Sequence, residues 1–153
     1  MRTLETRIPP PFVMVLLGAM AWTWAHYLPT LSFRLPFHTG IATAVAIAGL
    51  ALNGVPKVAF GRAGTTVNPL RPGSATHLVT SGVYRYSRNP MYLGQAVILL
   101  GWGIFLHNVV GFAAIPAFAL YISRFQIIPE ERHLLTRFGD EYTRFCQKSP
   151  RWL

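Results

Sequence analysis

The amino-acid sequence predicts an all-α, polytopic integral membrane protein with about four transmembrane helices, a long cytoplasmic loop and a C-terminal amphipathic helix. The chain has 153 residues, of which 52% are hydrophobic and only 12% are charged. That charged share is about half that of an ordinary soluble domain. Because a small soluble domain is mostly surface, it needs more charge than this. Four apolar runs in succession indicate that lipid covers part of the chain.

The first two expected spans are residues 12–28 and residues 39–55. The first lies between two prolines and carries aromatic residues near one end, as is typical of a membrane interface. The second contains Gly40, Ala44 and Ala48 at four-residue spacing. Small residues so placed let two helices approach closely, either within one chain or between two copies.

The third and fourth expected spans are residues 90–106 and residues 109–128, separated only by His107 and Asn108. So short a connection predicts an antiparallel helical hairpin. We expect Pro116 to break the fourth span. Each of the four runs is close to the ~20 residues needed to cross a bilayer, and several are on the short side.

The distribution of basic residues predicts one orientation. Arg34 is the one basic residue between the first and second spans, and the other 13 of the 14 lie on the opposite side. The positive-inside rule therefore places both termini in the cytoplasm. The compact size favours a prokaryotic inner membrane.

Two polar regions then face the cytoplasm. Residues 57–89 are rich in glycine and proline, which predicts a loop, and loops of this length are often functional. Residues 130–147 are expected to form an amphipathic helix beneath the membrane. Its apolar stripe consists of Leu134, Phe138, Tyr142 and Phe145.

The composition excludes several kinds of site. Cys146 is the single cysteine, so the chain has no internal disulfide and no cysteine metal cluster. The five histidines are scattered without ligand spacing, so no metal site is expected. A net charge of +9 is compatible with nucleic acid, but the basic residues lie between apolar runs and form no recognisable nucleic-acid module.

Residues 76–94 hold the first candidate site. Asn89 is a good N-cap and Pro90 suits the first helical position, so a helix is expected to begin there. A helix N-terminus favours a carboxylate or phosphate, and Arg88 offers a second anion partner. The alternative is an ordinary capped helix with an arginine at the lipid headgroups. Nearby aromatic faces and hydroxyls come from Tyr84, Tyr86 and Tyr92.

The second candidate site is Glu130 and Glu131, directly after Pro129. Their ordinary role is to complement the helix dipole in a first turn. They also face the start of the third span, where a carboxylate could accept hydrogen bonds from ribose hydroxyls or hold a cationic group. Arg124 lies inside the fourth span, so it either snorkels to the cytoplasm or points inward as a substrate anchor.

Together these stretches resemble the C-terminal core of the isoprenylcysteine carboxyl methyltransferases, and the related phospholipid methyltransferases share the general pattern. The resemblance rests on residues 76–94, Glu130-Glu131 and residues 138–142, and it covers about residues 60–153. It implies one membrane methyltransferase domain over residues 1–153. Residues 1–60 would supply two helices, and residues 61–153 would form the cofactor-binding core.

The resemblance also implies S-adenosylmethionine as the cofactor, bound on the cytoplasmic side, and Arg124 as the nearest candidate for a catalytic arginine at the substrate. The family usually has a histidine where this chain has Asn89, which caps a helix but carries no charge. The implied cofactor contacts are His77, Leu78, Val79, Tyr84, Arg88, Asn89, Pro90, Met91, Tyr92, Glu130 and Glu131.

The expected function is therefore S-adenosylmethionine-dependent methylation of a lipophilic acceptor at the membrane. Carboxyl O-methylation of an isoprenylcysteine-like substrate is the first candidate, and a related lipid or small hydrophobic molecule is the second. Two alternatives of other classes remain. One is an NADPH-dependent membrane reductase of the sterol reductase type, and the other is a non-catalytic membrane subunit, which Asn89 keeps open.

Overall fold

The structure is a computed structural model that describes residues 5–62 and 78–153. Within these ranges the chain is helical, and an isolated β-bridge joins Ser32 to Asn108. The expectation of an all-α fold is confirmed. The α-helices are α1 (Pro10–Tyr27), α2 (His38–Arg62), α3 (Pro90–Leu106), α4 (Ala114–Ile122), α5 (Ile128–Phe138) and α6 (Asp140–Lys148). Short 3-10 helices are η2 (Pro29–Leu31), η4 (Gly82–Arg85) and η5 (Val109–Ala113).

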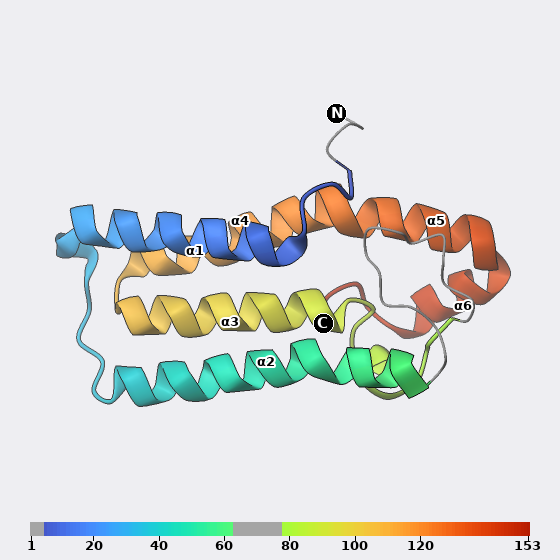
Figure 1. Cartoon of the computed structure of the whole chain (residues 1–153), viewed down its shortest axis with the longest axis horizontal. Helices are drawn as coiled ribbons and strands as arrows, with labels where there is room; N and C mark the ends of the chain where they lie inside the picture. Colours follow the sequence, from blue (N-terminus) through green and yellow to red (C-terminus); the bar gives the residue numbers. More distant parts are fainter. Residues whose placement is uncertain (1–4, 63–77) are drawn as a thin grey trace.

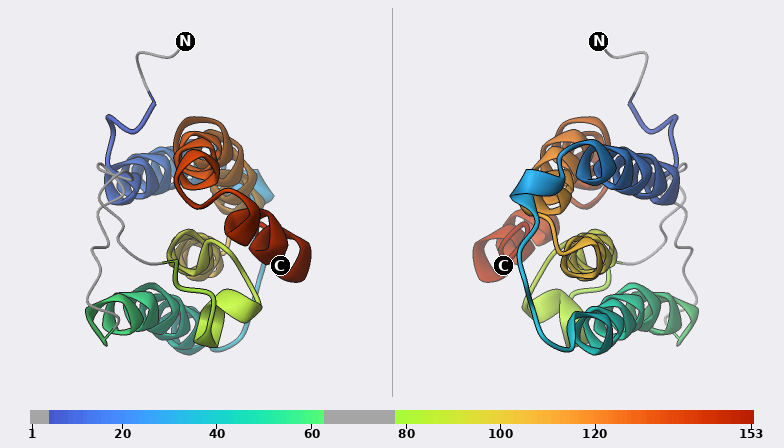
Figure 2. Two further views of the ribbon diagram at one scale, coloured as in Figure 1. Left: turned by 90° about the vertical axis from the view of Figure 1, so that its right-hand side faces the viewer. Right: turned by 90° about the vertical axis from the view of Figure 1, so that its left-hand side faces the viewer.

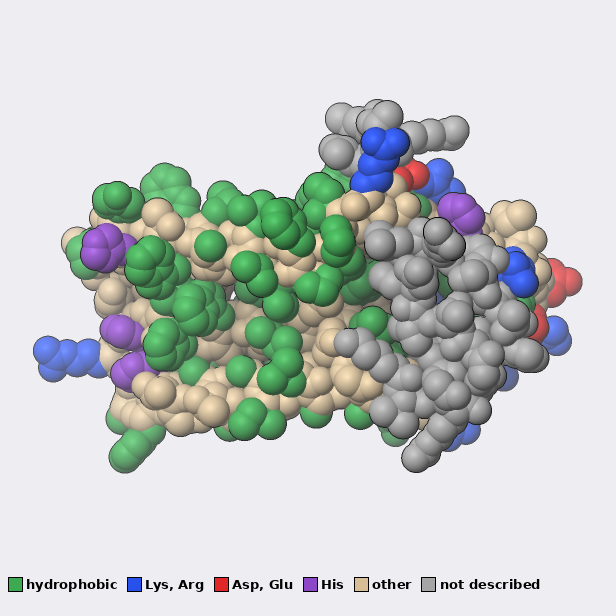
Figure 3. Space-filling model, in the orientation of Figure 1, with side chains coloured by type: hydrophobic (Ala, Val, Ile, Leu, Met, Phe, Trp, Pro, Cys, Tyr) green, Lys and Arg blue, Asp and Glu red, His purple; other side chains and the backbone are tan. Residues whose placement is uncertain are grey.

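The long helices run along one axis, with α3 between α2 on one side and α1 with α4 on the other (Figures 1 and 2). Two helical stretches, His38–Pro56 and Val109–Phe138, are long and apolar enough to cross a membrane, and Pro90–Leu106 is apolar but shorter. On the face shown in Figure 3, apolar side chains cover the helices and charged ones gather at the ends. Two of the four expected spans therefore meet the criterion of length and composition.

The contact between α2 and α3 brings their backbones together. A Cβ added to Gly94 would lie 2.6 Å from the backbone nitrogen of Asn53, and one added to Gly49 would lie 2.8 Å from the carbonyl oxygen of Gly94. Neither position has room for a side chain. Asn53 adds a polar contact, because its Nδ2 donates to the Met91 carbonyl at 3.1 Å.

The predicted small-residue face of α2 does not make this contact. Gly40, Ala44 and Ala48 are exposed, and no atom of the described chain lies within 4 Å of a Cβ built on Gly40. The residues that pack against α3 sit on another side of the helix, at Ala42 and Gly49 among others. Of the two expected uses of this face, packing within the chain is therefore not observed, and packing between two copies stays a prediction.

The expected hairpin of α3 and α4 is present, and Asn108 organises its turn. His107 ends α3 in the left-handed conformation, with φ of 39°. Asn108 is fully buried, and its Nδ2 donates to the Leu28 carbonyl at 2.9 Å and to Ser32 Oγ at 3.2 Å. Pro116 does not break the helix, because it lies in the first turn of α4, where its missing N–H is no loss.

The fourth span continues beyond residue 128 as one helical run through α5, with a π-helical segment, η6, at Ser123–Ile127. The backbone N–H of Ile128 donates to the Ser123 carbonyl, five residues earlier. Pro129 explains this geometry, because its ring would clash with the carbonyl of Phe125 in a regular α-helix. The wider π-turn relieves the clash without ending the helix.

The predicted single helix over residues 130–147 is wrong. Gly139 has φ of +50° and divides the segment into α5 and α6, and α6 turns back beneath α5 (Figure 1). The predicted apolar stripe therefore packs on the chain itself. Tyr142 and Phe145 are buried against Tyr84, with Leu134 and Phe138 at the edge of this cluster.

The start of the described chain is tied to η6 and α5. The Glu5 carboxylate pairs with Arg124 Nη1 at 3.0 Å and with Arg132 Nη2 at 2.6 Å. The Thr6 N–H donates to the Phe125 carbonyl at 3.0 Å. The hydrogen bond from Arg124, helped by Arg132, lowers the pKa of Glu5 below its ordinary value.

Replacing Gly94 by alanine should destabilise the protein, because the new methyl group would collide with the α2 backbone. We expect a loss of about 2 kcal/mol, which is typical of an overpacked interface. The matched control is Gly54→Ala on α2, where nothing lies within 4 Å and alanine favours the helix. Thermal unfolding in detergent, followed by tryptophan fluorescence, measures both. Equal midpoints for the two variants would contradict the close contact.

Replacing Glu5 by glutamine should lower the unfolding temperature at neutral pH, because two arginines lose their carboxylate. The lowered pKa means that this stabilisation is present above the ordinary pKa of 4.5 and is lost as the pH falls through the folded-state value. Melting curves of both proteins at neutral and acidic pH should therefore converge in acid. A gap that is independent of pH would show that the ion pairs do not stabilise the fold.

Candidate functional site

The candidate site centres on a hydrogen bond between the starts of two helices. Tyr92 lies in the first turn of α3 and Glu130 in the first turn of α5, and the tyrosine hydroxyl donates to Glu130 Oε1 at 2.6 Å. Tyr92 is buried, and Glu130 is partly exposed. Within residues 5–62 and 78–153, no basic side chain forms a salt bridge with Glu130. The carboxylate therefore keeps acceptor capacity for a ligand.

Tyr84 places a second phenol near this pair. It lies on η4 and is buried with Tyr142 and Phe145. Burial raises the pKa of the Tyr84 hydroxyl, and the negative charge of Glu130 raises it further. Tyr84 is therefore protonated at neutral pH and can donate a hydrogen bond. Leu78 and Val79, two of the expected cofactor contacts, pack against the same cluster.

The N-terminus of α3 lacks the side-chain cap that the sequence predicts. Asn89 occupies the N-cap position, but its Nδ2 donates to the carbonyl of Arg151 at 2.9 Å. Its backbone N–H donates to Ser87 Oγ at 3.1 Å. The predicted capping role of the Asn89 side chain is therefore wrong. The partial positive charge at the start of α3 stays available to an anion beside Tyr92.

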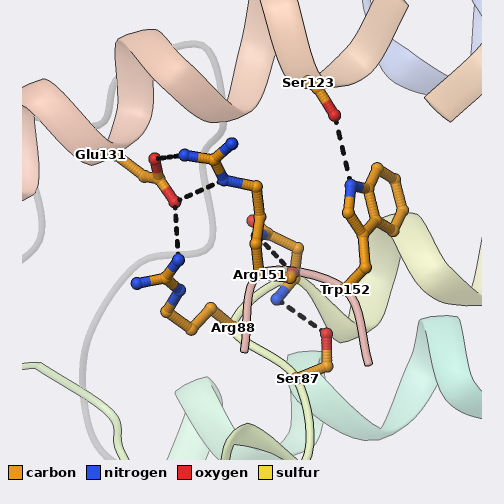
Figure 4. A network of polar contacts seen from close by, with 7 residues as sticks. Ser87, Arg88, Ser123, Glu131, Arg151 and Trp152 are labelled. Atoms are coloured by element: carbon orange, nitrogen blue, oxygen red, sulfur yellow. Dashed lines mark hydrogen bonds and ion pairs between the residues drawn. The ribbon is translucent and has the colours of Figure 1, made fainter. Parts of the chain in front are cut away.

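Glu131 pairs with Arg151 and Arg88, and Figure 4 shows it in this network of polar contacts. It accepts two hydrogen bonds from Arg151, from Nε at 3.0 Å and from Nη2 at 2.6 Å, and Arg88 Nη2 lies 3.3 Å away. Trp152 Nε1 donates to Ser123 Oγ at 3.2 Å. We call these five residues the C-terminal clasp. It joins α5, η6, the segment before α3 and the C-terminus.

The structure brings most of the predicted site residues to one end of the molecule, while Arg124 pairs with Glu5 instead. His77 lies outside the described residues. Arg88 and Glu131, both predicted cofactor contacts, engage each other in the clasp. The residues brought together are Tyr84, Arg88, Asn89, Pro90, Met91, Tyr92, Glu130 and Glu131.

Sequence reasoning missed two polar residues near the site. Gln95 follows Tyr92 by one helical turn and is buried, and its Oε1 has no hydrogen-bond partner in the described chain. A single amide side chain in an otherwise apolar helix could have drawn attention to Gln95 from the sequence alone. Arg151 had no comparable signal, because its partners are distant in sequence. No cluster of three or more metal-ligating side chains occurs in the described ranges.

Comparisons with known proteins identify the family of this chain. A family model described as phospholipid methyltransferase matches residues 37–141. An uncharacterized protein of Haemophilus influenzae is 46% identical over 63 residues, which are 41% of this chain and the whole of that protein.

Two relatives carry the name protein-S-isoprenylcysteine O-methyltransferase. The Schizosaccharomyces pombe protein is 37% identical over 76 residues, 48% of this chain and 31% of its own length. The Arabidopsis thaliana protein B is 35% identical over 107 residues, 68% of this chain and 53% of its own. The match thus spans about a third to a half of these enzymes. The matched family model, over a range that contains Tyr84, Tyr92 and Glu130, shows that this chain belongs to the phospholipid methyltransferase family, with isoprenylcysteine methyltransferases among its relatives.

Proposed function

We propose that this chain is an S-adenosylmethionine-dependent methyltransferase that acts at the membrane on a lipophilic acceptor. The observation that carries the proposal is the Tyr92–Glu130 hydrogen bond at the starts of α3 and α5. It joins two motifs on which the family resemblance rests. No observation on this chain favours the reductase or the non-catalytic subunit over a methyltransferase.

The residues present fit the chemistry of this cofactor. S-adenosylmethionine carries a ribose diol and two cationic groups, which need acceptors, and a carboxylate, which needs donors. Glu130 offers an acceptor with spare capacity, and Gln95 Oε1 is a buried acceptor without a partner in the described chain. The uncapped N-terminus of α3 offers donors to a carboxylate. Tyr84 and Tyr92 supply aromatic faces for a cation.

In this proposal the chain's own residues bind and orient rather than exchange protons. Tyr92 fixes one Glu130 oxygen and leaves the other to the cofactor. Tyr84, Tyr142 and Phe145 keep water from that side, because they are buried together. The bound cofactor supplies a methyl group already activated by a sulfonium. The protein's contribution is therefore alignment in a water-poor site.

The acceptor is proposed to be lipid-borne. An apolar groove of about 500 Å³ runs between α1, α2 and α3 and offers room for a hydrocarbon chain. Carboxyl O-methylation of an isoprenylcysteine-like group remains the first candidate. Arg124 would have to leave Glu5 at least in part to hold such a carboxylate. Four spans with both termini in the cytoplasm would place the cofactor on the cytoplasmic side. The groove is lined by residues such as Met14, Gly18, Ala46, Leu99, Trp102 and Phe105.

Removing the Glu130 charge should weaken cofactor binding. We expect Glu130→Gln and Tyr92→Phe each to raise the Kd for S-adenosylmethionine by roughly 10- to 100-fold, the range for a lost hydrogen bond to a charged group. Calorimetric titration of the detergent-purified protein measures this. Asp140→Asn, an exposed carboxylate on α6, is the matched control. A Kd for S-adenosylmethionine that is unchanged in both Glu130→Gln and Tyr92→Phe would contradict the proposed site.

Glu131→Gln should behave differently from Glu130→Gln, because Glu131 holds the clasp. We expect a loss of roughly 1–2 kcal/mol in unfolding free energy, since the bidentate partner Arg151 is partly exposed. Arg151→Gln should cost a similar amount, and the double variant should cost little more than either. Denaturant titration in detergent measures the cycle. Fully additive losses would show that the two side chains are not coupled.

A further inference from the structure

A second pocket lies between η4 and α6, apart from the Tyr92–Glu130 pair. Its volume is about 520 Å³. Two contacts fix its walls, because Ser149 Oγ donates to the Tyr84 carbonyl at 2.7 Å and Phe145 packs against Tyr84. We call it the basic pocket. Its lining includes Arg85, Glu141, Arg144, Phe145, Lys148 and Ser149.

The charges of the basic pocket are unbalanced. Arg85 comes from η4, and Arg144 and Lys148 come from α6, against the single carboxylate of Glu141. None of these three cations forms a salt bridge with a carboxylate of the described chain. Arg144 and Lys148 lie four residues apart on one helix face, where like charges repel. An anion in the pocket would relieve this repulsion.

The position of the basic pocket identifies the source of the anion. It lies at the end of the molecule where α3 begins, opposite the His107–Asn108 turn (Figure 1). The apolar helices stop there, so the pocket sits where lipid headgroups meet water in a membrane-spanning chain. Converging arginine and lysine side chains suit phosphate oxygens. A hollow of this size, open to solvent on one side, suits one headgroup better than the surface of a macromolecule.

We propose that the basic pocket binds the phosphate of an anionic phospholipid headgroup. Arg144 and Lys148 hold the phosphate from α6, and Arg85 closes the pocket from η4. The bound lipid would anchor the folded-back α6 to the membrane. Phe145 borders both sites, but Arg85, Arg144 and Lys148 take no part in the proposed cofactor site. Loss of lipid binding and loss of cofactor binding can therefore be told apart.

The test is lipid binding by the full chain in detergent, with short-chain phosphatidylglycerol and phosphatidylcholine as probes in native mass spectrometry. The wild type should prefer phosphatidylglycerol. At about 1 kcal/mol per basic residue, Arg144→Gln and Lys148→Gln should each weaken its binding about five-fold, and the double variant about thirty-fold. Arg85→Gln should match the single variants. These exposed positions tolerate substitution, and an unchanged unfolding midpoint verifies folding.

The control is Arg34→Gln, which removes the same charge from an exposed position between α1 and α2. It should leave phosphatidylglycerol binding unchanged. Equal weakening by Arg34→Gln, or no preference for phosphatidylglycerol in the wild type, would overturn the proposal. Glycerol phosphate is the soluble probe. If it binds as tightly as the lipid, the pocket takes a free phosphate compound and the membrane source is wrong.

Discussion

The arrangement of the site depends on a single carboxylate that receives two arginines. Glu131 binds Arg151 with both oxygens and lies within ion-pair distance of Arg88, so three distant segments meet at the start of α5. Adjacent residues on a helix point about 100° apart. Fixing Glu131 toward the C-terminus therefore leaves Glu130 directed at Tyr92. A structural ion pair thus orients the neighbouring residue that is free to bind a ligand.

The sequence predicted what depends on local pattern and missed what depends on distant contacts. Apolar runs bounded by proline located α1 and α3 to within two residues, and the motif residues Tyr92 and Glu130 do meet. The predicted end of the second span at residue 55 was wrong, because α2 continues through Pro56 to Arg62. The predicted capping role of Asn89 was wrong because its side-chain amide donates to the carbonyl of Arg151, 62 residues away. The single helix over residues 130–147 failed because Gly139 adopts positive φ, which the amphipathic pattern across it concealed.

The two ends of the helical bundle satisfy their polar groups by different means. At the His107 end, Asn108 is fully buried and bonds three partners without carrying charge. At the other end, carboxylates and arginines form ion pairs, and the basic pocket adds further cations. A neutral amide is cheaper to bury in lipid than a charged group. This asymmetry is consistent with the orientation that the basic residues suggest.

The π-helical turn before Pro129 determines which side chain occupies each position on the helix that follows. Such a turn holds one residue more than a regular helix over the same path, so every later side chain is shifted by one place. If the turn became α-helical with the same sequence, Glu130 would move to the place of Glu131 and meet the arginines. Pro129 would then occupy the place opposite Tyr92. The proline thus determines which of the two neighbouring glutamates faces Tyr92 and which one pairs with the arginines.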